Sequence, residues 1–241
     1  MSHLRFEFKY VLDPVQEQAL RSAVSHYMRP DPSVAGRGGW YPVTSLYFDT
    51  PQLADYYNKS GGYLIRKKLR VRIYEPSLQQ ETPEIWLEIK KKYDMAFKKS
   101  RVLITHEDWQ NLKHACYAKL LASPRSENDK AALNEFVWYL LQEGRRPSFF
   151  VRYLRHPYTD PHSDLRITFD SRIEAYRHAD LAEPRFPKRI HTGTVMEVKF
   201  SRNPLPGWLG AVLRMHNLTR DTFSKYGRSI ERLRSYNTMP R

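Results

Sequence analysis

Apolar and charged residues alternate through much of the chain, most regularly in residues 62–74 (GYLIRKKLRVRIY). Alternate side chains of a strand point to opposite faces, so Leu69, Val71 and Ile73 form an apolar face suited to packing. The opposite face carries four cations, Arg66, Lys68, Arg70 and Arg72. Like charges about 7 Å apart on one strand face repel each other. This face is therefore either an ordinary solvated surface or one wall of an anion site.

The same division into an apolar and a charged face predicts seven further strands. They span residues 4–11, 40–48, 84–93, 97–104, 148–156, 165–170 and 194–201, and 172–177 is predicted as a short addition. In 4–11, for example, Phe6, Phe8 and Tyr10 alternate with charged residues. The recurrence of charged faces favours a shared charged site over a set of independently solvated strands.

Helices are predicted between and after these strands. Asp13, Pro14 and Gln16 form the capping signature of a helix that ends near residue 28. Thr105 caps another predicted helix. Apolar residues at helical spacing place helices at 107–121, 130–142, 204–217 and 224–236, with a short helix or turn at 52–58.

The fold predicted from this pattern is α+β: a closed antiparallel eight-stranded β-barrel with helices packed on its outside. An open antiparallel sheet with one wet face also accommodates the strands. Closure does so better, because it removes the sheet edges and turns the charged faces into a lumen. The charged residues assigned to the lumen are Arg5, Lys9, Arg66, Lys68, Arg70, Arg72, Lys90, Arg155, Arg166 and Lys199, with Glu7, Glu88 and Glu197.

The formal net charge of +14 predicts a polyanionic partner: nucleic acid, an anionic membrane surface or a phosphate-rich small molecule. A lumen with an excess of cations repels itself when it is empty, so a multiply charged anion is expected to fill it. The glutamates are then explained as ligands of a hard divalent cation, because such ions bind carboxylates together with substrate phosphates.

Several functional classes lack their motifs. The sequence has no GxxxxGK[ST] or GxGxxG phosphate loop, so a Walker-type ATPase or kinase is not expected, and its nine histidines lack the HExxH spacing of a zinc hydrolase. The single cysteine, Cys116, excludes an internal disulfide and a thiolate metal cluster. No apolar run approaches transmembrane length and the N-terminus lacks a signal-peptide core, so a cytoplasmic protein without a transmembrane segment is expected.

A series of separated motifs resembles the triphosphate tunnel metalloenzyme (CYTH-like) superfamily and, within it, the VTC domain. The motifs are Arg5-Phe-Glu7-Phe-Lys9, Ser45-Leu-Tyr47-Phe-Asp49-Thr50, Lys68-Leu-Arg70-Val-Arg72, Trp86-Leu-Glu88-Ile-Lys90, Tyr153-Leu-Arg155, Met196-Glu197-Val-Lys199 and Ser224-Lys225-Tyr226. The resemblance covers nearly the whole chain and implies a single tunnel domain over residues 1–241. It also implies a metal-dependent enzyme that handles inorganic polyphosphate. The best-understood family member transfers the γ-phosphate of ATP onto a growing polyphosphate chain.

The first motif departs from the wider superfamily, which opens with two alternating glutamates before a lysine. Arg5 stands at the first of these positions. This change removes one acidic metal ligand and adds one cation, which favours the VTC branch over adenylate-cyclase-like or thiamine-triphosphatase-like members. The eukaryotic VTC proteins also carry a regulatory domain and membrane helices, and neither is expected in this chain.

The predicted site combines the lumen charges with the motif residues. Arginines grip phosphate oxygens with a forked geometry, while lysines act as point charges. Catalytic roles are predicted for Lys9, Arg70, Arg72, Lys90, Arg155 and Lys199. Substrate binding is predicted for Arg5, Arg66, Lys68, Tyr153, Arg166, Ser224 and Lys225. The resemblance makes Glu197 the ligand of Mn²⁺ or Mg²⁺, with Glu7 and Glu88 as weaker candidates. The expected partners are ATP, inorganic polyphosphate or tripolyphosphate, and pyrophosphate, without nucleic acid.

The residues also permit other interpretations. Tyr153 fits a buried core tyrosine, Ser224 a plain N-cap serine and Asp49 a turn residue before Thr50. A polymerase is predicted, but a tripolyphosphate or polyphosphate hydrolase of the same fold and a non-catalytic polyphosphate-binding protein stay open, because a sequence does not show turnover. A nucleic-acid-binding protein agrees with the net charge but lacks a recognised binding motif.

Overall fold

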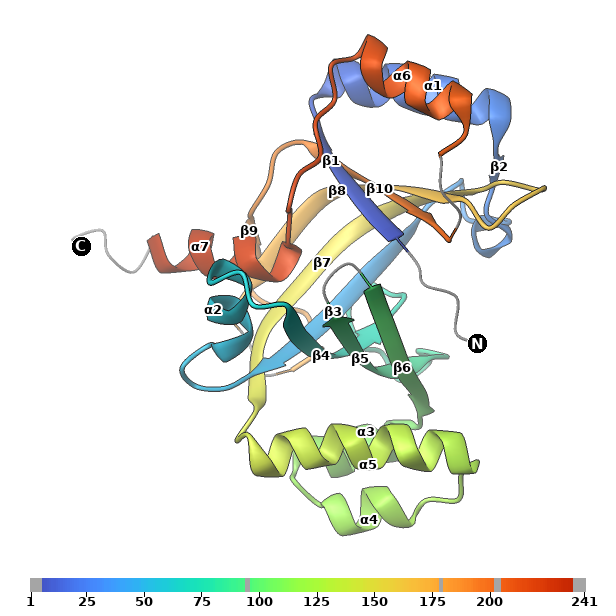
Figure 1. The fold of residues 1–241 in the computed structure, drawn as a ribbon. Coiled ribbons are helices and arrows are strands. Elements are labelled where there is room, and N and C mark those ends of the chain that lie inside the picture. Colours follow the sequence, from blue (N-terminus) through green and yellow to red (C-terminus); the bar gives the residue numbers. More distant parts are fainter. Residues whose placement is uncertain (1–5, 94–95, 178–179, 202–204, 236–241) are drawn as a thin grey trace.

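The computed structural model describes residues 6–93, 96–177, 180–201 and 205–235. Its strands are β1 (Phe6–Leu12), β2 (Arg29–Pro30), β3 (Tyr41–Asp49), β4 (Ile65–Ile73), β5 (Ile85–Tyr93), β6 (Ala96–Ile104), β7 (Arg146–Thr159), β8 (Arg166–Tyr176), β9 (Lys188–Arg189) and β10 (Thr194–Phe200). They form one antiparallel sheet whose main path runs β1-β10-β8-β7-β3-β4-β5-β6 (Figure 1). The two short strands extend this sheet, β2 on β7 and β9 on β8.

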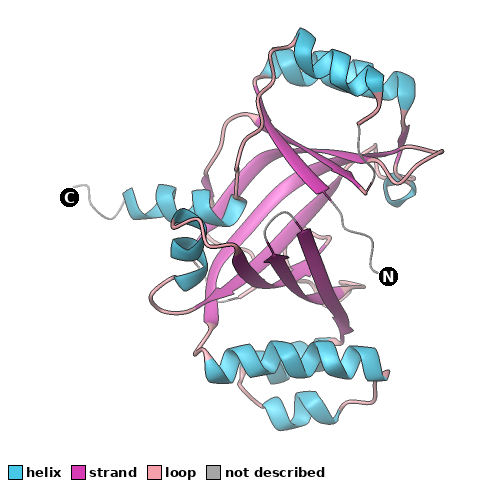
Figure 2. Ribbon diagram, viewed as in Figure 1, coloured by secondary structure: helices cyan, strands magenta, loops and turns pink. Residues whose placement is uncertain are grey.

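The helices gather in three groups around the sheet (Figure 2). They are α1 (Pro14–Tyr27), α2 (Ala54–Ser60), α3 (His106–Lys113), α4 (Tyr117–Ala122), α5 (Glu127–Gln142), α6 (Gly207–Met215) and α7 (Lys225–Ser235), with a 3₁₀ turn at Pro32–Val34. Figure 1 shows α1 beside α6 at one end of the molecule, α3, α4 and α5 at the other, and α2 with α7 between them.

Two apolar cores lie on the convex side of the sheet. In the first, Leu69, Val71 and Ile73 of β4 are fully buried and pack with Trp109 and Phe136 from the α3–α5 group. This confirms the predicted apolar face of residues 62–74. The second core joins the outer faces of β1, β8 and β10 to α1 and α6. Burying these faces leaves the opposite, charged face of the same strands turned toward the inside of the curve.

The expectation that helices pack only on the outside does not hold for α7. Its residues Tyr226 and Ile230 pack with Tyr47 of β3, Phe149 of β7 and Val195 of β10. Tyr47 lies on the face that also carries charged side chains, since it accepts a hydrogen bond from Arg70. The helix therefore fills part of the concave side, because the inner faces of β3 and β7 are largely apolar there.

Closure of the sheet into a barrel is not confirmed. Within the described residues, β1 and β6 are the two edges of the main path and share no backbone pairing. Side chains cross the gap instead: Lys90 Nζ of β5 lies 2.7 Å from Glu7 Oε2 of β1. The coarser prediction holds, since the chain is α+β with one large antiparallel sheet flanked by helices.

Two predicted element boundaries differ from the structure for backbone reasons. The helix predicted over 107–121 is two helices, because Ala115 adopts a left-handed conformation (φ 57°) that ends α3 before α4 begins. The strands predicted at 165–170 and 172–177 are one strand, β8, interrupted by a bulge at Arg172 (φ 50°). The capping box predicted from Asp13 and Gln16 is present, and Thr105 caps α3 as predicted, in a capping box with Asp108.

Candidate functional site

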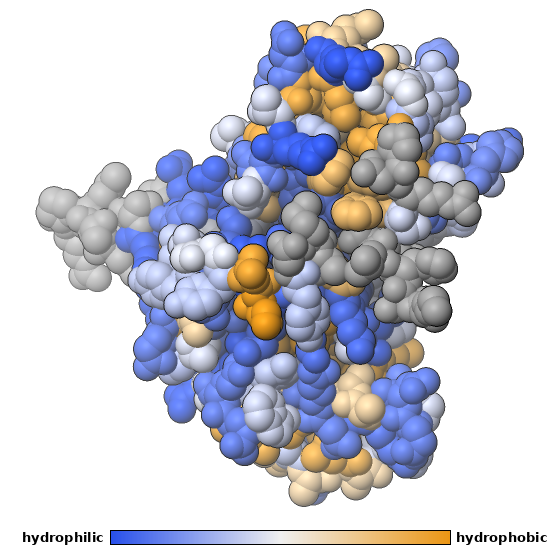
Figure 3. Space-filling view, viewed as in Figure 1, coloured by the Kyte–Doolittle hydropathy of each residue, from blue (hydrophilic) through white to orange (hydrophobic). Residues whose placement is uncertain are grey.

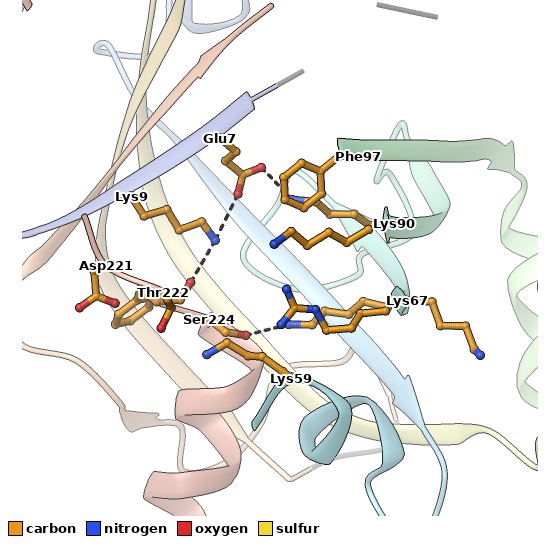
Figure 4. Close-up of a pocket in the computed structure, with 13 residues that line it drawn as sticks. Glu7, Lys9, Lys59, Lys67, Lys90, Phe97, Asp221, Thr222 and Ser224 are labelled. Carbon is orange, nitrogen blue, oxygen red and sulfur yellow. Dashed lines mark hydrogen bonds and ion pairs between the residues drawn. The ribbon is translucent and has the colours of Figure 1, made fainter. Parts of the chain in front are cut away.

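A cavity of about 270 Å³ opens at one end of the concave face (Figure 4). We call it the basic mouth; its lining is Glu7, Lys9, Lys59, Arg66, Lys67, Lys68, Lys90, Lys92, Phe97, Asp221, Thr222, Phe223 and Ser224. Six of these are predicted site residues: Glu7, Lys9, Arg66, Lys68, Lys90 and Ser224. In Figure 4, Lys9 and Lys90 reach toward each other across the cavity from opposite strands, and Lys59 approaches from α2. The sequence therefore identifies most of the strand-borne cations of this cavity.

Glu7 is shared between two lysines of the basic mouth. Its Oε1 lies 3.2 Å from Lys9 Nζ and its Oε2 lies 2.7 Å from Lys90 Nζ. Burial by itself raises the pKa of Glu7, but Lys90 and Lys9 outweigh that effect and hold the pKa well below its ordinary value. Lys9 also donates to the carbonyl oxygen of Phe223 (3.0 Å), so β1 is tied to the segment before α7.

Glu88 anchors the two arginines of the most cationic strand. Its Oε2 accepts from Arg70 Nε at 2.7 Å and lies 3.8 Å from Arg72 Nη1, while Lys99 pairs with its other oxygen. Burial raises the pKa of Glu88, but Arg70, Arg72 and Lys99 together lower it well below the ordinary value. Arg72 also donates to Ser45 Oγ (3.2 Å). Both guanidinium groups are thereby fixed in direction on the concave face.

A second buried cluster is built from β7, β8, β10 and the start of α7. Arg155 binds Asp170 through two hydrogen bonds of 2.7 Å, and Lys225 Nζ lies 2.5 Å from Asp170 Oδ2. Glu197 lies 3.0 Å from Lys225 and 2.9 Å from Lys199. Burial raises the pKa of Glu197, but Lys199 and Lys225 lead the cations that outweigh it, so the carboxyl stays ionised.

Asp170 is a residue of this cluster that the sequence interpretation did not assign to the site. It is fully buried and lies on the polar face of its strand, in register with Arg155 of β7 and Val195 of β10. Its alternation with Arg166 and Thr168 was a usable signal. An isolated acid on a strand is usually solvated, however, and only the register places it against two buried cations.

In the described part of the chain, Lys68 lacks the carboxylate partner that Lys9 and Lys90, the other predicted site lysines of the basic mouth, have in Glu7. Its Nζ donates to Ser224 Oγ at 2.7 Å, and among the described residues no carboxylate forms an ion pair with it. Burial, followed by the charges of Lys9 and Lys90, lowers the pKa of Lys68 to about 7. Lys68 is therefore a half-buried amine whose charge no carboxylate among the described residues neutralises in an ion pair.

Ser224, Tyr153 and Asp49 fit the structural interpretations given above. Ser224 and Tyr153 also contact cations of the predicted site. Ser224 Oγ accepts from Gly227 N (3.1 Å), as an N-cap serine does, while it also contacts Lys68. Tyr153 is a buried wall residue whose hydroxyl accepts from Arg72 at 3.4 Å. Asp49 accepts from the backbone of the turn and from Tyr226 Oη (2.5 Å), so it also anchors α7.

The remaining predicted residues lie elsewhere. Arg166 shares the concave face but pairs with Asp31 (3.1 Å) and lines a different cavity of about 510 Å³, together with Trp86 and Arg101. Arg5 lies outside the described residues. Lys59 on α2 is a further residue of the basic mouth that no strand pattern could reveal.

The described residues contain no group of three or more His, Cys, Asp or Glu side chains arranged to hold a metal ion. Glu88 is 1% exposed and paired with two arginines and a lysine, and Glu197 is 6% exposed and paired with Lys9, Arg155, Lys199 and Lys225. Glu7 lines the basic mouth, and the carboxylates of Glu7 and Glu197 lie 3.2 and 3.7 Å from Lys9 Nζ, so these two acids are the pair that could share an ion beside the mouth. A divalent ion there needs further oxygen ligands, which phosphate groups provide.

Comparisons with solved structures show the same fold. A putative adenylyl cyclase from Hippeastrum, described as having a dominant triphosphatase activity, superposes with a TM-score of 0.54 at 16% identity over 98% of both chains. A putative adenylate cyclase from Bacillus halodurans gives a TM-score of 0.54 at 10% identity, over 95% of this chain and 97% of that one. At these identities the two structures show the fold alone.

No curated protein matches the sequence. No helix in the described residues combines the length and the apolar character needed to span a membrane. The model of one family, the VTC domain, matches residues 4–234. With the tunnel fold and the basic concave face, this match over nearly the whole chain shows that the protein belongs to the VTC domain family.

Proposed function

We propose that this protein is a metal-dependent polyphosphate polymerase that transfers the γ-phosphate of ATP onto inorganic polyphosphate. The observation that carries the proposal is the convergence of cations from five strands and α7 on one concave face: Lys9, Lys68, Arg70, Arg72, Lys90, Arg155, Lys199 and Lys225. Such a face suits a substrate with one negative charge per repeating unit. Membership of the VTC domain family supports the same substrate class.

The arginines of the site are held ready for phosphate oxygens before a substrate arrives. Glu88 orients Arg70 and Arg72, and Asp170 orients Arg155. Phosphoryl transfer depends mainly on positioning and on neutralising charge. Donors fixed by buried carboxylates do this without reorganising during the reaction. The buried acids thus explain how so many cations coexist and why they point inward.

In the proposed reaction, an oxygen of the terminal phosphate of polyphosphate attacks the γ-phosphorus of ATP. The bond between that phosphorus and the β,γ-bridging oxygen breaks, its electron pair leaves with ADP, and the polymer gains one phosphate. Arg70 and Arg72 would bind the transferred group, while Lys9 and Lys90 at the basic mouth would neutralise the remaining phosphates.

Glu7 and Glu197 are the residues we propose to hold Mn²⁺ or Mg²⁺ beside the phosphates. When bound, the ion would screen the negative charge that develops on the phosphate oxygens. Lys9, which contacts both carboxylates, would shift toward the substrate as the ion takes up their charge. The two glutamates are thereby expected to keep their ionised form, as their lowered pKa values favour.

A hydrolase is the second candidate. The Hippeastrum protein with this fold is described as having a dominant triphosphatase activity. The same cationic face would bind tripolyphosphate. In a hydrolase, water rather than polyphosphate would then attack the terminal phosphorus. The cytoplasmic location and the single-domain organisation stay predictions.

Incubating the protein with ATP and Mn²⁺ tests the proposal. We expect long-chain polyphosphate on a stained gel, with one ADP released for each phosphate added to the polymer. The Arg70→Met variant should make neither, while Arg29→Met, which removes an exposed cation on β2, should resemble the wild type. Orthophosphate released from tripolyphosphate without polymer would establish the hydrolase. Absence of both products, with tight polyphosphate binding, would establish a binding protein.

A further inference from the structure

A second cationic surface is formed by α7, β9 and the residue that follows β8. A cavity of about 470 Å³ is lined by Arg189, Arg228 and Arg232 together with His191. A neighbouring cavity of about 620 Å³ is lined in part by Arg177, Lys188 and Arg234. We call these six cations the outer basic surface. Figure 3 shows the side of the molecule occupied by α2 and α7 as mainly hydrophilic.

The outer basic surface adjoins the basic mouth at Phe223. Phe223 lines the mouth, and its ring also contacts His191 (5.0 Å between centroids) and Arg228 (5.8 Å). Lys59 bridges the same boundary from α2. Burial lowers the pKa of Lys59, and the charge of Glu231 raises it. Lys9 of the basic mouth and Arg228 of the outer basic surface lower it further, so charges of both surfaces act on this lysine. A flexible polyanion that leaves the mouth next to Phe223 therefore meets Arg228 first.

Charge balance separates this surface from an ordinary solvated one. The two cavities are lined by seven cations and by only two acids, Glu231 and Asp49. Asp49 is 1% exposed and its oxygens are occupied by the turn backbone and Tyr226, so it does not offset the surface charge. Arg228 pairs with Glu231 at 3.2 Å, and elsewhere on the molecule the half-buried Arg152 faces both Glu174 and Glu183. The outer basic surface thus keeps an excess of positive charge at the rim of a polyanion site.

We infer that the outer basic surface binds the part of a linear polyphosphate chain that extends beyond the basic mouth. This inference rests on the proposed function. A chain with one end held in the mouth presents its remaining phosphates to the surface at high effective concentration, so individually weak contacts add to the affinity. Single-stranded nucleic acid is a poorer fit, because such sites stack bases on exposed aromatic rings. The two aromatic residues that line these cavities are Phe149, which is buried, and Tyr176, which is half-buried.

The inference predicts a dependence on chain length. Tripolyphosphate should reach only the mouth, whereas a chain of about 100 phosphates should reach both sites. The test variant is the triple substitution Arg177→Gln, Arg189→Gln and Arg228→Gln. The matched control triple, Arg29→Gln, Lys119→Gln and Lys130→Gln, removes three exposed cations from other elements. Affinities are measured by calorimetry at several salt concentrations, after thermal melts show that both triples fold.

We expect the test triple to bind tripolyphosphate within about twofold of the wild type but to bind the long chain about tenfold more weakly or worse. Its slope of log affinity against log salt should be shallower by about two, because each lost phosphate contact removes about 0.7. The control triple should change neither value. If the test triple does not fold, the double variant Arg177→Gln and Arg189→Gln takes its place, with about two-thirds of the change in slope.

Three results would overturn the inference. Equal weakening by both triples would mean that only net charge matters. Unchanged long-chain affinity in the test triple would mean that the surface is not used. Equal competition by a single-stranded oligonucleotide of similar charge would assign the surface to nucleic acid. Failure of the proposed function looks different: the wild type would not bind tripolyphosphate, or the Arg70→Met variant would bind it normally.

Discussion

Single residues of the concave face are stabilised by opposite charges that different strands supply. Glu7 of β1 bridges Lys9 and Lys90, and Glu88 of β5 bridges Arg70 and Lys99. Removing one partner of a buried ion pair leaves an uncompensated charge, which usually costs about 3–5 kcal/mol. The consequences of a substitution therefore depend on how many partners remain.

Glu197→Gln and Glu88→Gln should separate a metal role from a structural role. We expect Glu197→Gln to lower turnover about 100-fold or more while polyphosphate still binds, because it loses the charge that would hold the divalent ion. Its loss of stability should be smaller than that of Glu88→Gln, because Lys9 keeps Glu7 as a partner and both Arg155 and Lys225 keep Asp170. Glu88→Gln should instead lower the free energy of unfolding by about 3 kcal/mol or more, since two arginines and a lysine lose their carboxylate. Its dependence on Mn²⁺ concentration should stay that of the wild type.

Manganese titrations of turnover, together with chemical denaturation, measure both effects. Wild-type turnover and metal dependence in Glu197→Gln would remove that residue from the metal site. A shifted metal dependence in Glu88→Gln, without a loss of stability, would move the site to Glu88.

Lys68 should make the empty protein more stable as the pH rises above neutrality. Its pKa is about 7 in the folded protein against an ordinary 10.5, so between these values the unfolded chain binds the extra proton. The free energy of unfolding should therefore increase with pH across this window. Lys68→Met should flatten the increase but not abolish it, because burial also lowers the pKa of Lys99, to about 8.

Denaturation curves at pH values between about 7 and 10 measure this slope. The groups that act on Lys68 are Lys9, Lys90, Asp55 and Lys59. Phosphates bound at the mouth should raise the pKa of Lys68 and so restore its charge. Tripolyphosphate binding near pH 8 should therefore be accompanied by proton uptake. The Lys68→Met variant should take up about one proton fewer than the wild type. Calorimetry in buffers of different ionisation enthalpy counts these protons. An identical pH slope and proton uptake in wild type and variant would contradict this account.

At the level of elements, α7 decides the shape of the site. It begins with Lys225, which contacts Asp170 and Glu197, and its Tyr226 donates to Asp49 at the end of β3. Burial, followed by the charge of Asp49, raises the pKa of Tyr226, which keeps the hydroxyl protonated and donating. One buried hydrogen bond thus helps to fix the helix that carries the last motif.

Tyr226→Phe should loosen this helix. We expect the free energy of unfolding to fall by about 1–3 kcal/mol, because Asp49 loses a buried donor. Tripolyphosphate affinity should fall as well, since Ser224 and Lys225 depend on the helix for their position. Tyr63→Phe is the matched control, because that side chain is 62% exposed. Unchanged stability in Tyr226→Phe, measured by urea denaturation beside this control, would show that the apolar packing of α7 and the ion pairs of Lys225 hold the helix without this hydrogen bond.

The bounds of the elements show where the sequence was sufficient. The capping box of Asp13 and Gln16 and the alternation of β4 appear as predicted, because both depend on residues near in sequence. The break at Ala115 and the bulge at Arg172 did not follow from the sequence, since neither residue is a usual former of left-handed backbone. The paired strands and packed helices around these positions impose that conformation.

For the whole molecule, the excess of positive charge should make stability depend on bound polyanion. A ligand that binds only the folded state adds about 2.7 kcal/mol when present at 100 times its dissociation constant. Tripolyphosphate and ATP should therefore raise the melting temperature, and the shift should shrink as salt is added. Adenosine without phosphates should not raise it. Thermal melts with the three ligands measure this, and equal stabilisation by adenosine would contradict a phosphate-binding concave face.

The sequence by itself determined the strands, their charged and apolar faces and the family, because alternation and motif order are properties of neighbouring residues. Only the tertiary structure decided which charges meet. The register sets Lys9 opposite Glu197 and Arg70 opposite Glu88. The tertiary structure also leaves the two sheet edges unpaired within the described residues and places α7 on the inner face. A one-residue shift of register exchanges the faces of a strand, and distant contacts, rather than local pattern, select among registers.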